Sequence, residues 1–305
     1  MTVQNSQPLS PGEQGNLYDS KRQKRYRLDN IFAAITWTAT FLALLILAVL
    51  LIDVLIDGFG RLNWSFIVSD ISPRPTRAGI FQALVGSIWL LGLTALISFP
   101  LGVGTGIYLE EFAADSLLAK IVEINISNLA GVPAIIYGLL GLGIFVNLLR
   151  PITGGNSIIS GALTMSLLIL PIIIVATREA LRSVPDSTRL AGLALGATLW
   201  QTIRSHVFPV ALPGILTGTI LALSRAIGEA APLIVIGAAG YIAFTPDNLQ
   251  SPFTALPVLI YRWVDAPQDL FHDKAAAAII VLMILLVTMN ATAIYLRNKF
   301  QRQGR

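Results

Sequence analysis

The chain has 305 residues, of which 54% are hydrophobic and only 12% are charged, and its formal net charge is +4. Soluble domains carry roughly 25% charged residues, so this composition is typical of a membrane protein and argues against a soluble enzyme. The sequence contains no cysteine and only two histidines, which excludes disulfides and thiolate chemistry and argues against a histidine metal site. In such a chain the basic residues report topology, and we expect no nucleic-acid partner.

The N-terminal segment differs in composition from the rest of the chain. Residues 1–30 are polar and become basic toward their end, with little apolar surface for a core. We therefore expect a disordered cytoplasmic tail over 1–30. The apolar run at 31–56 is too long for the core of a signal peptide, so it predicts a retained first transmembrane helix.

Five further apolar stretches are long enough to cross a bilayer core of about 30 Å as helices. They are 80–109, 124–149, 157–177, 207–239 and 275–296. The sequence thus predicts an all-α membrane protein with six transmembrane helices. In this topology 14 of the 21 Lys and Arg residues lie on the side of the N-terminus. We therefore expect both termini in the cytoplasm, with a C-terminal tail at 297–305.

Small residues four positions apart recur within the predicted spans, at Gly102 with Gly106 and at Gly214 with Gly218. Such pairs let two helices approach closely, which explains them without a ligand. The Gly-rich run at 102–106 lies inside an apolar span and is followed by no Lys, so we do not interpret it as a phosphate-binding loop.

Two predicted loops are unusually long. The cytoplasmic loop 178–206 has helical spacing, with Ser187 as an expected N-cap and Gly196 as an expected C-cap. Its pattern fits either a surface that docks a partner or an interfacial helix lying on lipid. The outer loop 240–274 contains a short apolar stretch at 255–264, for which we expect a half-helix or an interfacial segment.

The most distinctive charged residues are Arg225 and Glu229, which lie inside the predicted fifth span. A charge near the bilayer centre costs at least about 2.5–3.5 kcal/mol on insertion scales, so both residues should face protein or a water-filled path. Their spacing of four allows an ion pair on one helix face. The pair is either a structural contact or a gate at which the guanidinium recognises an oxyanion such as phosphate. Pro232, one turn further, is expected to kink the helix.

The loop after the fourth span resembles the coupling motif of ABC importer permeases, "EAA, three residues, G, nine residues, I-x-L-P". The sequence has Leu where the motif begins with Glu, Gly in place of its second Ala, and His in place of its Ile, but it keeps the glycine and the final proline. The matching positions are Leu190, Ala191, Gly192, Gly196, His206 and Pro209. The resemblance implies that a helix from Ser187 to Gly196 docks on an ATPase subunit.

Three further segments resemble phosphate importer permeases of the PstA type. They are 100–113, 128–141 and 226–233, of which the last is similar to the run "A-x-G-E-T-A-P-L" with Ala230 in place of Thr. The resemblance covers about 80–296 and implies the type I ABC importer permease fold. It also implies that Arg225 and Glu229 take part in phosphate passage.

The resemblance further implies a multi-pass subunit of the bacterial inner membrane and a set of partners. These are a homologous phosphate permease, two copies of a cytoplasmic ATPase, a periplasmic or extracellular phosphate-binding protein and the lipid bilayer. The chain itself is expected to need no cofactor and no metal and to have no ATPase site, because ATP binds to the partner ATPases. It has no Gly-rich loop ending in Lys and Ser or Thr.

Three alternatives remain open at the level of sequence. A permease of the same architecture could carry sulfate or molybdate, because a guanidinium alone does not distinguish these oxyanions. A buried Arg and Glu would also suit a secondary transporter or channel that uses an ion gradient. A sensory membrane component is the third alternative.

Overall fold

The structure is a computed structural model that describes residues 11–113, 116–238, 242 and 244–303, and all regular elements in this part of the chain are helical. Among these residues, five helices are long and apolar enough to cross a membrane, and a sharply bent helix pair makes a sixth segment if counted as one span. The predicted all-α membrane fold is therefore confirmed, with one of the six segments bent. The chain divides into two compact units, Met1–Ile56 and Asp57–Arg305.

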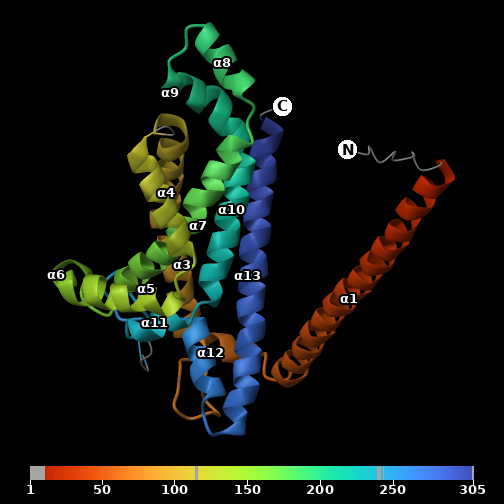
Figure 1. The fold of residues 1–305 in the computed structure, drawn as a ribbon. Coiled ribbons are helices and arrows are strands. Elements are labelled where there is room, and N and C mark those ends of the chain that lie inside the picture. Colours follow the sequence, from red (N-terminus) through yellow and green to blue (C-terminus); the bar gives the residue numbers. More distant parts are fainter. Residues whose placement is uncertain (1–10, 114–115, 239–241, 243, 304–305) are drawn as a thin grey trace, which may run out of the picture. The chain divides into compact units, whose positions relative to one another are not determined.

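The first unit consists mainly of one helix, α1, which runs Pro11–Phe59 (Figure 1). Its segment Leu28–Phe59 is apolar enough to span a membrane. The expected disordered tail is wrong for residues 11–30, which are helical, while residues 1–10 lie outside the described residues. Lys, Arg, Gln and Leu are frequent at 21–28 and are strong helix formers, and lengthening an existing helix avoids the cost of nucleation.

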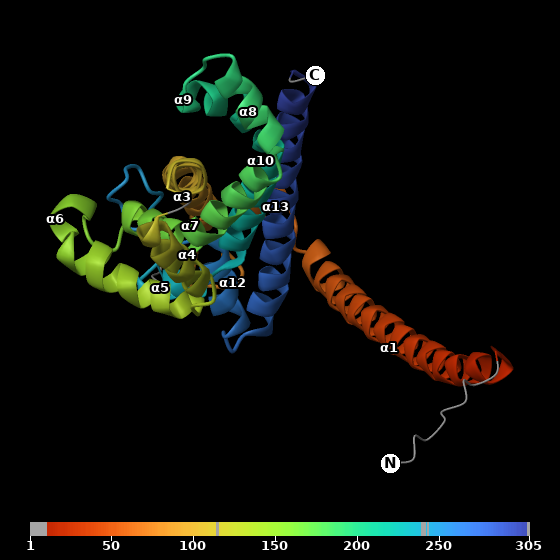
Figure 2. The same cartoon turned by 45° about the horizontal axis from the view of Figure 1, so that its top comes forward.

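The core of the second unit forms around α7 (Ile158–Arg182), which packs against α3 (Phe81–Ile107) and α10 (Phe208–Gly228). In the described part of the chain α7 is the most buried spanning helix, because it has neighbours on several sides. α10 also contacts α13 (Asp269–Gln303), so that α7, α10 and α13 lie side by side (Figure 1, Figure 2).

The small residues of α3 lie against α7. A Cβ atom added to Gly102 would lie 2.6 Å from Cγ2 of Ile173, and one added to Gly106 would lie 2.7 Å from Cβ of Thr177. The glycine pair of α10 meets alanines of α7 in the same way. Close helix packing, as expected from the sequence, therefore explains all four glycines.

The third predicted span is broken. α4 (Leu117–Ala130) and α5 (Ala134–Gly141) meet at a bend of 106°, and α5 continues through η2 (Leu142–Leu148), a π-helical segment, to α6 (Arg150–Thr153). The expectation of one straight span over 124–149 is therefore wrong. Pro133 lies at the break, where it cannot donate a backbone hydrogen bond and disfavours helical geometry in the residue before it.

The fifth span also ends earlier than expected. α10 stops at Gly228, Glu229 has extended backbone geometry, and a short helix, α11 (Ala231–Val235), follows. The expected span over 207–239 is therefore wrong beyond Gly228, and residue 239 lies outside the described residues. Pro232 lies in the first turn of α11, a position that tolerates its missing N–H, and so it begins a new helix instead of kinking a continuous one.

A second core cluster lies at the end of this unit where α13 begins. It joins α2 (Trp64–Val68), α12 (Leu256–Val264) and the first turns of α13. The ring of Trp263 lies 6.2 Å from that of Phe66 and 5.9 Å from that of Phe271, measured between centroids. The short helix expected at 255–264 is present as α12, which is too short to span a membrane.

The packing of α3 on α7 predicts opposite effects for two glycines of one helix. Gly106→Ala should destabilise the protein by about 1–3 kcal/mol, because the new methyl group overlaps Thr177. Gly104→Ala is the control, because no atom lies within 4 Å of its added Cβ, and alanine favours the helix. Thermal unfolding of the purified variants in detergent measures both effects, and equal stability of the two variants would contradict the packing.

Candidate functional site

The loop predicted to dock a partner forms two short helices that project from the second unit at the end where α13 terminates (Figure 1). They are α8 (Asp186–Ala194) and α9 (Leu199–Thr202), followed by a π-helical turn, η3 (Ile203–Val207). Leu190 is 65% exposed, Leu195 is 89% exposed and Trp200 is 53% exposed. Ala191 is exposed on the same helix as Leu190. The tip of the loop therefore presents apolar side chains that no described residue covers.

The ends of α8 differ in detail from the prediction. Ser187 is not the N-cap, because the helix begins at Asp186 and its N-cap residue is Pro185. Gly196 follows the C-cap residue, Leu195, and has a φ of +83°, a left-handed conformation that favours glycine. Its N–H donates to the carbonyl of Leu193, while the next N–H donates to the carbonyl three residues before the cap. Gly196 thus ends α8 sharply, as expected in outline.

Of the remaining motif positions, Gly192 is buried, whereas His206 and Pro209 are exposed. Gly192 is the buried residue of α8, and a Cβ there would lie 2.6 Å from the side chain of Thr202, so only glycine lets α8 pack on α9. Pro209 lies in the first turn of α10, where its missing N–H is tolerated. His206 is exposed in η3. The structure therefore divides the motif into an exposed face, Leu190 and Ala191, and positions that hold the loop's backbone.

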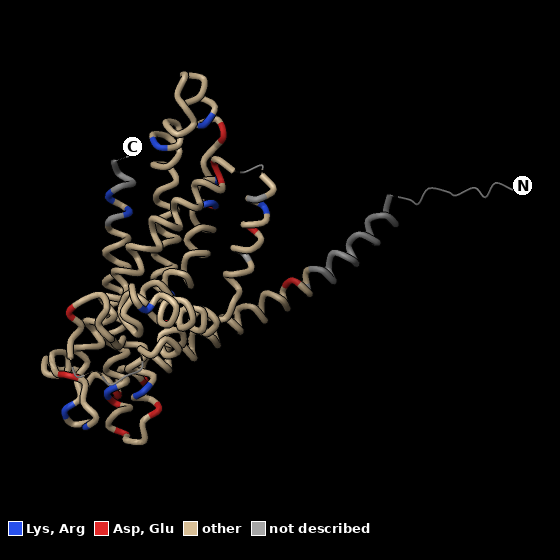
Figure 3. Tube along the Cα trace, turned by 90° about the vertical axis from the view of Figure 1, so that its left-hand side faces the viewer, with Lys and Arg blue, Asp and Glu red and all other residues tan. Residues whose placement is uncertain are grey.

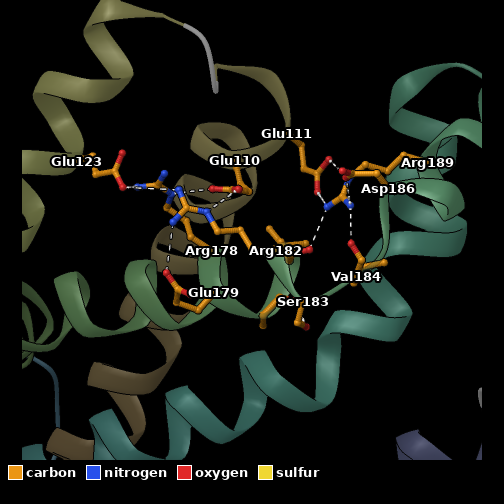
Figure 4. Close-up of polar contacts among 12 residues, drawn as sticks. Glu110, Glu111, Glu123, Arg178, Glu179, Arg182, Ser183, Val184, Asp186 and Arg189 are labelled. Atoms are coloured by element: carbon orange, nitrogen blue, oxygen red, sulfur yellow. Dashed lines mark hydrogen bonds and ion pairs between the residues drawn. The ribbon is translucent and has the colours of Figure 1, made fainter. Parts of the chain in front are cut away.

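Arg189 fixes α8 to the end of the second span (Figure 4). Its Nη2 and Nε donate to the two carboxylate oxygens of Glu111, at 2.6 Å and 3.1 Å. Glu111 lies in η1 (Tyr108–Phe112), the π-helical continuation of α3, and its side chain is 4% exposed. Arg189 also donates to the backbone carbonyls of Leu181 and Val184 at the end of α7. The hydrogen bonds with Glu111 raise the pKa of Arg189 above its ordinary value, so the guanidinium stays charged.

A second ion cluster joins α3, α4 and α7 beside this contact (Figure 4). Glu110 accepts a hydrogen bond from Arg178 at 3.0 Å and one from Arg182 at 2.8 Å. Arg178 also lies 3.0 Å from a carboxylate oxygen of Glu123 on α4. Because Arg178 and Glu110 are largely buried, the cluster holds the ends of α3 and α7 and the middle of α4 at fixed positions.

These ion pairs were not identified as functional from the sequence. The signals were present, because two adjacent carboxylates follow a long apolar span and Arg178 and Arg182 are four residues apart on one helix. In the sequence, Arg178, Arg182 and Arg189 indicated only that their loop is cytoplasmic. Which acid meets which base depends on tertiary packing, since the partners lie 68–78 residues apart.

Arg225 and Glu229 form a long contact at the break between α10 and α11. Nε of Arg225 lies 3.5 Å from Oε1 of Glu229, and their side chains are 47% and 25% exposed. Arg225 lies in the last turn of α10, whereas Glu229 is the first residue beyond that helix. The predicted ion pair is present, but it joins a helix to its break instead of two turns of one helix.

The break at Glu229 packs against the other broken segment. A Cβ added to Gly138 of α5 would lie 2.8 Å from Cα of Pro232, so α5 and α11 are in backbone contact. The hydroxyl of Tyr137 donates to the carbonyl of Leu129 at 2.7 Å, across the bend between α4 and α5. Both breaks in the spanning helices thus lie together and close to the charged pair. In the described part of the chain no cluster of three metal-ligating side chains occurs.

The ion pair between Arg189 and Glu111, called the clamp below, is expected to stabilise α8 against local unfolding. Arg189→Gln should increase hydrogen exchange across 186–194 roughly 100-fold, because removing one partner of a largely buried ion pair costs about 3 kcal/mol. Arg204→Gln removes an exposed charge of the same loop that has no ion pair among the described residues and is the matched control. Equal protection of α8 in the two variants would exclude the clamp.

Comparison with known proteins assigns the chain to a family. Residues 98–299 match the family described as "binding-protein-dependent transport system inner membrane component". The chain is 33% identical over 253 residues to a probable ABC transporter permease protein of Bacillus subtilis, YqgI, covering 78% of this chain and 85% of that protein. It is 31% identical over 287 residues to a phosphate transport system permease protein, PstA 1, of Mycobacterium tuberculosis, covering 92% and 91%.

Solved structures agree on the fold. A chain of the inward-facing methionine ABC transporter MetNI superimposes with a TM-score of 0.56 at 17% identity, covering 70% of this chain and 93% of that one. The predicted ABC importer permease fold is therefore confirmed. The chain belongs to the inner membrane components of binding-protein-dependent transport systems and is a multi-pass membrane protein with the fold of ABC importer permeases.

Proposed function

We propose that this chain is a transmembrane permease subunit of an ATP-driven importer of inorganic phosphate. The observation that carries the proposal is the Arg225 and Glu229 pair at the break between two helices, in a chain whose relatives include phosphate transport permeases. A guanidinium offers planar, paired donors to an oxyanion, and interrupted helices are typical of substrate sites in transporters.

The geometry of the pair suits a transient phosphate contact. At 3.5 Å the contact is longer than a typical charge-assisted hydrogen bond of about 2.7–2.9 Å, and Arg225 is half-exposed. Incoming phosphate therefore competes with one weak carboxylate contact and meets little steric obstruction. Glu229 lies outside α10, so its carboxylate swings away without disrupting a helix. In this role Glu229 restrains Arg225 when no anion is present.

The exposed face of α8 is the proposed contact with a cytoplasmic ATPase. Leu190 and Ala191 supply the apolar surface, Ser187 lies in its first turn, and Gly192, Gly196 and Pro209 shape its backbone. The clamp between Arg189 and Glu111 transmits a displacement of α8 to α3, and the Glu110 cluster carries it to α4 and α7. ATP closure of the ATPases would in this way rearrange the helices around the path.

The proposed complex contains this chain, a homologous permease, two copies of the ATPase and an extracytoplasmic phosphate-binding protein. ATP binds to the ATPase subunits and needs no site on this chain. The end of α13 lies at the same end of the second unit as α8, which supports a cytoplasmic C-terminus (Figure 1). Residues 297–303 continue α13 as a helix, and by the topology of the spans the N-terminus is also cytoplasmic.

Transport by the reconstituted complex tests the proposal. In liposomes that contain all subunits, uptake of labelled phosphate should require ATP and resist competition by sulfate. Arg225→Gln should reduce uptake at least tenfold while the subunits still co-purify, because the amide stays polar but loses the charge and the paired donors of the guanidinium. Arg262→Gln, an exposed arginine of α12, is the control.

Each contrary outcome has a distinct meaning. Uptake near the wild-type rate in Arg225→Gln would remove this residue from the path. Competition by sulfate would change the substrate but keep the architecture. Uptake that follows an ion gradient and ignores ATP would overturn the proposal.

The docking face of α8 predicts a separate loss of assembly. Ala191→Trp should weaken recovery of the ATPase with the chain at least tenfold, because the large ring prevents close contact at an exposed alanine. Gln268→Trp introduces the same large ring at an exposed position before α13, away from α8, and should leave recovery unchanged. Full ATPase recovery with Ala191→Trp would exclude this face.

A further inference from the structure

A cationic hollow lies at the end of the second unit remote from α8, among the loop before α3, α2 and the first turns of α13. Its volume is about 290 Å³. Its lining includes three cationic residues and two of its hydroxyl-bearing residues, which are Arg61, Arg77, Lys274, Ser69 and Thr76. Figure 3 shows charged residues gathered at this end of the molecule. None of these residues belongs to the path or to the coupling loop.

Lys274 is a buried cation without a counter-charge in the described part of the chain. Only 9% of the residue is exposed, its Nζ donates to the backbone carbonyl of Ala78, and it lies 5.8 Å from the ring centroid of Phe66. A carbonyl and an aromatic ring offset only part of the cost of removing an ammonium group from water. An anion in the adjacent hollow would offset the remainder.

Two arginines also line the hollow, of which one is paired with an acid and the other is not. Nη2 of Arg61 lies 2.8 Å from Oδ2 of Asp273, and this pair is partly exposed. Arg77 is exposed and has no ion pair among the described residues. Asp70, the other nearby acid, accepts a hydrogen bond from Gln82 at 2.6 Å. Of the residues that line the hollow, three are cations and none is an acid.

The neutral groups of the hollow are also suited to an oxyanion. The hydroxyl groups of Ser69 and Thr76 line it and make no side-chain hydrogen bond to another described residue. Hydroxyl donors together with Lys and Arg are the groups that surround phosphate in proteins, because each phosphate oxygen accepts several hydrogen bonds. Trp64 beside the hollow is 76% exposed, as is typical of side chains at the membrane interface.

We propose that the cationic hollow binds a phosphate group, with Lys274 as its buried charge and Arg77 as its free guanidinium. Free inorganic phosphate and the headgroup of an anionic phospholipid both carry this group. This site is separate from Arg225 and does not depend on the proposed transport activity, because binding is measured on the chain alone without ATP. In the proposed topology the hollow faces the outside of the membrane.

Two binding measurements on the full-length chain distinguish the sources. Both use the Arg225→Gln background, so that the path does not contribute. The first is equilibrium dialysis of labelled inorganic phosphate against the chain in phosphatidylcholine nanodiscs. The second is native mass spectrometry of phosphatidylglycerol retained by the chain after extraction from mixed nanodiscs.

Three variants locate the site. Arg77→Gln should weaken binding at least tenfold in at least one of the two measurements, which are the dialysis arm and the lipid arm. Lys274→Met should do the same. Arg74→Gln is the control, because it removes an exposed cation from the same loop that does not line the hollow. Because Arg77 is exposed, its variant tests the site even if Lys274→Met does not fold.

The results of the two binding measurements together identify the source of the phosphate group and test the proposal. A loss confined to the dialysis arm identifies free phosphate, and a loss confined to the lipid arm identifies a headgroup. Absence of binding in both arms, or an equal loss in Arg74→Gln and Arg77→Gln, would overturn the proposal.

Discussion

The structure depends on one constraint, which is that a bilayer leaves no water to satisfy backbone polar groups or charges. Continuous helices meet this constraint along α3, α7, α10 and α13. Where the chain interrupts its helices, at the bend before Pro133 and at Glu229, the breaks are packed against one another through Gly138 and Pro232. The hydroxyl of Tyr137 satisfies the carbonyl of Leu129 beside the first break. The two interruptions therefore lie in one region, where α5 packs against α11.

The same constraint concentrates charge at the helix ends. A chain with few ionisable residues uses six of them in the contacts of Glu110 and Glu111 with the arginines of α7 and α8 and in the link to Glu123. These contacts connect a solvent-exposed helix to buried spans. The ion pairs fix the position of α8 relative to α3, α4 and α7, and such a connection is what the proposed coupling to an ATPase requires.

The opposite end of the second unit is held by aromatic packing instead of by ion pairs between helices. There the aromatic cluster of Phe66, Trp263 and Phe271 packs the short helices α2 and α12 against α13 without a spanning segment. Lys274 is buried in that cluster while other cations surround the hollow beside it. The residues that line the hollow include three cations and no acid, so the positive charge that favours an anion is local to the hollow.

The sequence by itself determined the all-helical membrane class of the protein, the packing role of Gly102 and Gly106, and the charged pair at Arg225 and Glu229. These features depend on local composition and spacing. The length and apolarity of a segment largely decide whether it inserts into a bilayer. Tertiary structure alone decided the bend between α4 and α5, the end of α10 at Gly228 and the pairing of Arg189 with Glu111. A proline or glycine only permits a break, and whether the chain breaks depends on what packs against the freed backbone. Likewise, an arginine meets a distant carboxylate only after the helices between them have been arranged in space.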